Sequence, residues 1–577
     1  MDSTSDLLTT FLPAELIIDI FSRVLVSNSR RKWTDVSPPH TILTPFFLGK
    51  ICRSWRSVAW NNSELWTSLT LTLEREHYEA QVSLLDLWLE KSGTQPLDIT
   101  IRGPGGDEEE DWELNPPHEI MRKLAAVSER WRSMDMFIPH PCYIDLACMR
   151  SRLPLLQNLS IRPPDGVDPL FNHKLDFFSY APSLTNLSIG GLYFSEAIDM
   201  PWAQLQSLLG QDFLADDCYT MLESAPNLRV CRFDVIHQSS DFAYPSSSTI
   251  SLSHLHTLEL SDVGNMLATV FLYSLELPSL ASLILDLGFS FDDWEYFSMS
   301  SVTSLIGRSG CAASLRKLSI TNLRLVEQEL IDCLASAPNL AELGLHVEYP
   351  KTPPGMSLSD TFFAALSPPS TRSVETASVL PFDRPLVPKL RWFEYSGPVN
   401  VTGYTVRTLL SYRWNQDTFN AASPSPHAVA KLEHVSIEST SILSFPRSDQ
   451  AALRELAAAG MDLILTNGYT SWIHDNWVSI YEVIRAQHAL RKALSTEGTL
   501  NGKAREIDLG GEADGEGVWV PNRPSHAHSY SFPLIPPQVR AVGAVLLTRR
   551  SQTPGIPPPR RPLSNSTSKP CSIAYST

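Results

Sequence analysis

The sequence lacks several features that would assign a function directly. Its eight cysteines lie far apart and form no C-x-x-C pair, which argues against a disulfide framework and against a zinc knuckle. Basic residues are too few to balance the acidic ones, and the formal net charge of −17 argues against binding to a nucleic-acid backbone. The longest apolar runs, such as Ala541 to Leu547, are too short to span a bilayer.

The first residues, Met1 to Leu12, contain no basic segment followed by an apolar run, so we expect no secretory signal. Dispersed cysteines suit a reducing compartment. These absences predict a cytoplasmic or nuclear protein whose partners include neither a membrane nor a nucleic acid.

Fragments of catalytic and metal-binding motifs occur, but each is incomplete. His118-Glu119 begins like the helix motif of zinc proteases, but Arg122 stands where the second histidine is needed. His254 and His256 flank Leu255 without a third ligand. The sequence shows no nucleophile beside a base, although a triad assembled by folding would leave no local pattern. We therefore expect no catalytic residue, no metal and no cofactor, and an enzyme within this chain is the least favoured function.

The most informative positive feature is a recurring sequence pattern of leucines, which we call the leucine cadence. Pro182-Ser-Leu184-Thr-Asn-Leu187-Ser-Ile189 returns in similar form at Pro226 and at Pro338. The first leucines of all the copies are Leu156, Leu184, Leu205, Leu228, Leu255, Leu280, Leu315, Leu340, Leu390 and Leu432. Most of their spacings match the leucine-rich-repeat period of about 20–29 residues, and the longer ones are explained by inserted loops or a missed unit.

The order of apolar and polar residues in one unit predicts its structure. Leu187 and Ile189 alternate with a polar residue, which places both on one face of a short strand. Amphipathic stretches between the strands, such as Asp216 to Ser224 and Val326 to Ser336, predict helices. One unit cannot bury its apolar side alone, but stacked units can. We therefore predict an α/β fold, a leucine-rich-repeat-like solenoid with strands on the concave side; an unrelated leucine-rich α/β domain is the alternative.

The N-terminal block has a different, helical pattern. Its first run starts at Leu12-Pro13, with the proline where a helix tolerates it, and continues with an apolar face that includes Leu16, Ile20 and Phe21. A second run covers Phe46 to Ala59. About fifty residues form only a weak core. Large apolar side chains here either build that core or contact a partner.

This block resembles an F-box, in the form common in large families of basidiomycete fungi. The resemblance rests on Leu12-Pro13-x-Glu-Leu16-Ile-x-x-Ile20-Phe21, on Ile51-Cys52-Arg-x-Trp55-Arg and on Leu65-Trp66. It extends through segments resembling the linkers of those proteins, at 88–101 and 130–134, and covers roughly residues 10 to 465. The gap from Ser27 to His40 is longer than usual for the family.

The resemblance implies a Skp-type adaptor as partner and, through it, a cullin. The matching adaptor-binding positions are Leu12, Pro13, Leu16, Ile20, Phe21, Ile51, Cys52 and Trp55. The expected function is that of a non-catalytic substrate receptor in an SCF-type ubiquitin ligase, acting in ubiquitin-dependent protein degradation. The alternative is a repeat scaffold with a vestigial F-box and no ligase association.

The expected organisation has five parts. They are an F-box domain at 8–68, a linking segment at 69–150, the repeats at 151–467, a helix at 468–496 and a disordered tail at 497–577, which is rich in glycine, proline and arginine. In a curved solenoid the polar residues between core positions face the concave side and bind the protein substrate. The candidates are Arg232, Glu259, Ser319, His346 and Glu394, together with Ser160, Ser188 and Ser436.

Overall fold

The structure is a computed structural model, and parts of the chain between residues 12 and 466 are described. The described ranges are 12–26, 44–103, 116–138, 140–162, 174–190, 197–238, 249–288, 297–347, 357–367, 384–415, 429–439 and 445–466. All of them belong to one compact unit, Met1–Lys492. The helix expected at 468–496 and the tail expected at 497–577 lie outside them. Within the described ranges, no helix combines the length and the hydropathy needed to cross a bilayer.

One 14-stranded sheet dominates this unit, and its strands pair in chain order, each parallel to the next. Its strands are β1 (Ser68–Thr72), β2 (Leu97–Arg102), β3 (Trp131–Phe137), β4 (Asn158–Arg162), β5 (Asn186–Gly190), β6 (Ser207–Leu214), β7 (Val230–His237), β9 (Thr257–Val263), β11 (Ser282–Leu287), β12 (Lys317–Leu323), β13 (Glu342–Val347), β15 (Trp392–Gly397), β17 (His434–Ser439) and β18 (Asp462–Thr466). Two short parallel pairs, β8 (Ile250–Ser251) with β10 (Leu275–Glu276) and β14 (Leu358–Ser359) with β16 (Val399–Asn400), stand beside it.

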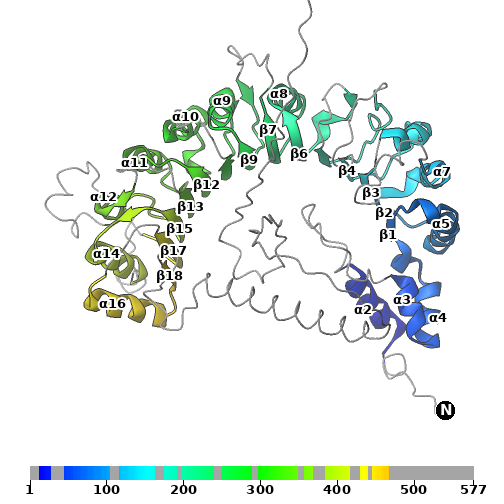
Figure 1. Ribbon diagram of the computed structural model, residues 1–577, viewed down its shortest axis with the longest axis horizontal. Helices are drawn as coiled ribbons and strands as arrows, with labels where there is room; N and C mark the ends of the chain where they lie inside the picture. Colours follow the sequence, from blue (N-terminus) through cyan, green and yellow to red (C-terminus); the bar gives the residue numbers. More distant parts are fainter. Residues whose placement is uncertain are drawn as a thin grey trace, which may run out of the picture. The chain divides into compact units, whose positions relative to one another are not determined.

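Helices connect the strands and cover one face of the sheet (Figure 1). They are α5 (Tyr78–Ser92), α7 (His118–Ala126), α8 (Ala215–Ser224), α9 (Asn265–Ser274), α10 (Met299–Ser309), α11 (Glu327–Ser336), α12 (Asp360–Ala365), α14 (Gly403–Trp414) and α16 (Arg447–Ala458). Among the described residues before β1, three further α-helices occur: α2 (Ala14–Val26), α3 (Pro45–Ile51) and α4 (Arg53–Asn61). The amphipathic stretches identified in the sequence correspond to α8 and α11.

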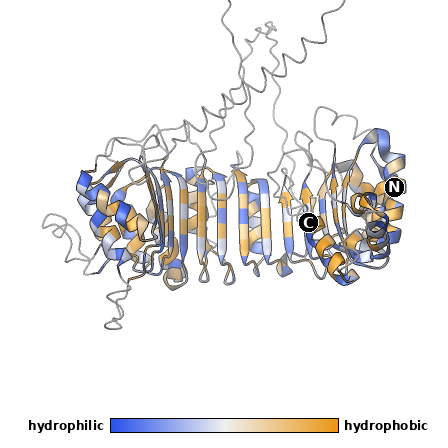
Figure 2. Cartoon of the chain, turned by 90° about the horizontal axis from the view of Figure 1, so that it is seen from below, coloured by the Kyte–Doolittle hydropathy of each residue, from blue (hydrophilic) through white to orange (hydrophobic). Residues whose placement is uncertain are grey.

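The leucine cadence marks the strands. Every first leucine of the cadence is buried and precedes a strand by two residues, as Leu156 precedes β4 and Leu432 precedes β17. The next apolar residues fall in register across the sheet: Leu258 pairs with Cys231 on one side and Leu283 on the other. Buried and less buried residues alternate along the strands, and hydrophobic and hydrophilic residues alternate with them (Figure 2). Successive side chains of a strand point to opposite faces, so the core lies on the helix-covered face, and we call the opposite face the open face.

The sheet begins earlier than the sequence suggested. Residues 69–150 were expected to be a linking segment, but they contain β2 and β3, and β1 starts at Ser68. The sheet therefore extends through the residues expected to form the linking segment, and the expected boundary at residue 151 stays a prediction. In β2, Leu97, Ile99 and Ile101 alternate with polar residues, as the apolar residues of the later strands do, and all three are buried. This strand lacks the proline and the leucine that precede the later strands at a fixed distance, so the leucine pattern did not identify it.

Candidate protein-binding surfaces

The N-terminal helices are joined to the sheet by a cluster of aromatic residues. The indole nitrogen of Trp66 donates to the carbonyl of Ala59 at 2.7 Å, and that of Trp88 on α5 donates to the carbonyl of Trp66 at 2.7 Å. The rings of Trp66 and Trp88 lie 5.1 Å apart in an edge-to-face arrangement, and Phe46 on α3 contacts both. These contacts make α3 and α4 part of the same core as β1.

Helix α2 packs through one side and exposes the other. Ile17 and Phe21 are buried, and the Phe21 ring lies 4.8 Å from the ring of Trp55 on α4. Leu16 and Ile20, one helical turn apart, remain 51% and 37% exposed. The apolar face read from the sequence is therefore wider than the part that α4 covers, and the remainder faces outward.

Helix α3 repeats this arrangement. Thr44 caps its N-terminus by accepting the backbone N–H of Phe47 at 3.4 Å, and Pro45 occupies the first turn. Phe47 and Ile51, also one turn apart, are 41% and 50% exposed. We call the four residues Leu16, Ile20, Phe47 and Ile51 the N-terminal apolar surface.

The eight expected adaptor-binding residues divide into exposed and packed ones. Leu16, Ile20, Ile51 and Pro13 are exposed, and Leu12 packs at the edge of the core. The Cys52 sulfur caps α4 by accepting the N–H of Trp55 at 3.4 Å, and both residues are partly buried. Phe21 is buried against Trp55 in the core, and its expected contact with an adaptor stays a prediction. Sequence reasoning missed Phe47, although its spacing of four residues from Ile51 was a usable signal.

The residues expected to bind a substrate all lie on the open face, but not in one row. Arg232 and Glu259 are paired in register on β7 and β9, and their side chains form an ion pair. Ser319 and Glu394 occupy the same row on β12 and β15. His346 is displaced: Gly344 fills that row on β13, and His346 lies two residues further along the strand.

A polar cluster on the open face surrounds His434. Its Nδ1 lies 2.7 Å from a carboxylate oxygen of Asp462, and its Nε2 lies 3.4 Å from Glu394. The Trp392 ring stacks on the imidazole with centroids 3.8 Å apart and planes 16° from parallel. Burial lowers the pKa of His434, but the hydrogen bonds to Glu394 and Asp462 raise it more, so the net shift is upward. The pKa of Glu394 is lowered, first by its hydrogen bond with His434.

The middle of the open face is acidic. Burial raises the pKa of Asp234 on β7, and repulsion from Asp262 raises it further. Burial and repulsion from Asp262 likewise raise the pKa of Asp286 on β11, against a hydrogen bond donated by Asn322 at 2.9 Å. Sequence reasoning did not select Asp234 or Asp286, because alternating polar residues give no indication of which strands become neighbours.

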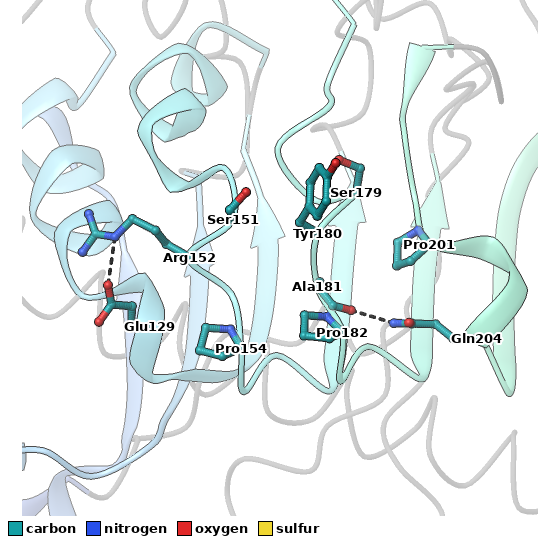
Figure 3. Close-up of a pocket in the computed structure, with 10 residues that line it drawn as sticks. All are labelled: Glu129, Ser151, Arg152, Pro154, Ser179, Tyr180, Ala181, Pro182, Pro201 and Gln204. Carbon is teal, nitrogen blue, oxygen red and sulfur yellow. Dashed lines mark hydrogen bonds and ion pairs between the residues drawn. The ribbon is translucent and has the colours of Figure 1, made fainter.

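A cleft of about 570 Å³ lies where the turns before β4, β5 and β6 meet (Figure 3). Pro154, Pro182 and Pro201 line it, and Arg152 forms an ion pair with Glu129 across 3.1 Å. Gln204 donates to the carbonyls of Ala181 at 2.6 Å and Leu184 at 2.8 Å. The polar groups of this cleft hold neighbouring turns together, and its lining contains no histidine or cysteine.

Within the described part of the chain, no group of three or more His, Cys, Asp or Glu residues is arranged to hold a metal ion. In the incomplete zinc-protease motif, His118 and Arg122 both contact Asp145, at 2.6 and 3.0 Å, and thereby attach α7 to the segment His140–Met149 after β3. Burial raises the pKa of the Cys142 and Cys333 thiols to about 12, so neither forms a thiolate at neutral pH.

Comparisons with known proteins leave the family open. No family model matches this chain, and no curated protein matches it. Among solved structures it is similar to a Bacteroides fragilis protein determined by a structural genomics consortium, with 15% sequence identity and a TM-score of 0.28. That alignment covers 50% of this chain and 76% of the other. A likeness this slight assigns neither fold nor function.

Proposed function

We propose that this chain is the substrate-recognition subunit of an SCF-type cullin ubiquitin ligase. Its N-terminal helices act as an F-box that binds a Skp-type adaptor, and its sheet is the strand layer of a leucine-rich-repeat-like solenoid that binds a protein substrate. The chain itself is not catalytic: it supplies proximity and orientation, and the reacting groups belong to other subunits.

The observation that carries this proposal is the N-terminal apolar surface. Two short helices expose two pairs of large apolar side chains, Leu16 with Ile20 and Phe47 with Ile51. Exposed apolar side chains on helices that both pack against α4 favour coverage by a partner, because burial removes their surface from water. Three of the four match adaptor-binding positions of the F-box resemblance.

The repeat pattern supports the second half of the proposal. Each leucine of the cadence introduces one strand, and successive strands are parallel neighbours in chain order. A parallel sheet built in this way has one strand per sequence unit, as in a leucine-rich-repeat solenoid. The open face then serves as the concave recognition surface.

Adaptor binding tests the proposal directly. The wild-type chain is expected to co-purify with a Skp-type adaptor, and Ile51→Asp to weaken that complex at least about tenfold, because a carboxylate would be buried without a partner. Leu155→Asp is the matched control: Leu155 is a similarly exposed apolar residue, at 44%, in the turn before β4. It should bind as tightly as wild type.

Two outcomes contradict this function. The first is that the wild-type chain binds no Skp-type adaptor, and the second is that Ile51→Asp and Leu155→Asp bind it equally. Cullin co-precipitation distinguishes the alternative, a scaffold with a vestigial F-box, because a scaffold retains partners on its sheet but brings down no cullin.

A further inference from the structure

The open face changes its electrostatic character along the sheet. In the strands β1 to β5, the unburied charged residues are Asp98, Arg102, Arg132, Asp135 and Arg162, so cations slightly outnumber carboxylates. In the strands of the large sheet from β6 to β18, the unburied lysines and arginines are Arg232 and Lys317. The unburied carboxylates there are Asp212, Asp234, Glu259, Asp262, Asp286, Glu342, Glu394, Glu438 and Asp462. The second part of the face is therefore strongly acidic.

The two cations of this part are already engaged. Arg232 forms its ion pair with Glu259, and Lys317 lies 3.0 Å from Glu342. Arg232 lowers the pKa of Asp234, but burial and the carboxylates of Asp262 and Glu259 raise this pKa more strongly. The fold thus brings like charges together across strands, which is unfavourable and which a cation bound from outside would offset.

An aromatic platform stands at the far end of this surface. The Trp392 indole is 43% exposed, and one of its faces stacks on His434, which is held between Glu394 and Asp462. In the same row, Trp392 pairs in register with Glu342 of β13. An indole flanked by carboxylates attracts an ammonium or guanidinium group by combined cation–π and ionic interactions.

We propose that the open face from β7 to β17 binds an extended lysine- and arginine-rich segment of a partner protein. This surface repels phosphate backbones, and every strand of the large sheet from β7 to β17 except β12 carries at least one unburied carboxylate. Neighbouring strands are about 4.8 Å apart, so the path from β7 to β17 is roughly 29 Å, the length of about nine extended residues. A basic peptide matches both the charge and the length. This inference rests on the proposed function, because it identifies the basic segment as part of the protein substrate.

Peptide binding to the purified full chain, without any adaptor, tests this inference. The probe is a fluorescent peptide of about ten residues, with alternating lysine and glycine, and the control peptide has glutamine in place of lysine. The wild-type chain should bind the lysine peptide, more weakly as salt increases, and should not bind the glutamine peptide. Asp234→Asn with Asp286→Asn should weaken binding roughly tenfold, and Trp392→Ala about 2- to 5-fold.

A second pair of substitutions separates a local effect from net charge. Glu223→Gln on α8 with Asp332→Asn on α11 removes the same charge from exposed positions of the helical face. This pair should bind the peptide as wild type does. The inference would be overturned if the wild-type chain did not bind the lysine peptide, or if Asp234→Asn with Asp286→Asn bound it as tightly as wild type. It would also be overturned if both double variants lost the same amount of peptide affinity. Ile51→Asp should bind the peptide normally, so failure of adaptor binding and failure of this inference are distinguishable.

Discussion

The Trp392 ring stacks on the His434 imidazole, with centroids 3.8 Å apart, although a helix and a long connection separate the two residues in the chain. The stack forms because Trp392 and His434 begin adjacent parallel strands, β15 and β17, and are paired in register. It buries His434 on one side, while Glu394 and Asp462 surround its nitrogens.

The pKa values of His434 and His346 should lie on opposite sides of the ordinary histidine pKa of 6.5. The pKa of His434 is raised above 6.5 by its carboxylate partners, and that of His346 is lowered below 6.5, chiefly by burial. An NMR titration of the ring protons should therefore show His434 titrating at higher pH than His346. The reverse order would contradict the described cluster.

The same shift makes stability depend on pH. Because the folded-state pKa of His434 is raised, its contribution is fully present below the unfolded value and is lost as pH rises through the folded one. The difference in unfolding free energy between wild type and His434→Asn should be larger near about pH 5.5 than near about pH 8.5. Urea denaturation at both pH values measures it, and a difference that does not change with pH would refute the role of the ion pairs.

Arg413 should be among the residues most important for stability. Its buried guanidinium donates to the carbonyls of Leu386 at 2.9 Å, Leu366 at 3.1 Å and Pro388 at 3.2 Å. Burial lowers its pKa to about 10, so it stays charged at neutral pH. Arg413→Met leaves these carbonyls without their donor and should cost about 3–5 kcal/mol in urea denaturation. Arg23→Met, at a side chain 79% exposed, should change stability by less than about 0.5 kcal/mol.

Gly210 should tolerate no side chain while Phe233 is present. It occupies a core row of β6 in register with Phe233, and a Cβ atom there would lie 2.6 Å from the Phe233 ring. Gly210→Ala should destabilise the protein by about 1–3 kcal/mol. Combining it with Phe233→Leu should cost less than the sum of the two single changes. A double-mutant cycle by thermal unfolding tests this, and strict additivity would contradict it.

Val235 has a left-handed backbone conformation, which asparagine adopts more easily than valine. Its φ is +58°, and the equivalent positions of β6, β9 and β12 hold Asp212, Asp262 and Asn322, also at positive φ. A β-branched residue is strained there, whereas asparagine is tolerated. Val235→Asn should therefore stabilise the protein by about 1 kcal/mol in urea denaturation. Val230→Asn, on the same strand at an ordinary position, should give no gain.

Most strands of the parallel sheet could be predicted from the sequence, because a short local pattern of leucines marks them. Leu187 and Ile189 alternate around one polar residue, and Leu184 precedes them at a fixed distance, so strand, face and core row follow from spacing alone. Stacking of similar units then places each strand beside the next in the chain. Helices α8 and α11 followed from their apolar periodicity in the same way.

Only the tertiary structure decided which residues of an apolar or polar set are exposed. Leu16, Ile20 and Phe21 all belong to one apolar stretch, but the position of α4 covers Phe21 and leaves the other two exposed. Likewise, the polar residues of separate strands carry no local sign of their neighbours. The connections between strands vary in length, so the approach of Trp392 to His434, and of Asp234 to Asp262, depends on strand register rather than on any spacing in the chain.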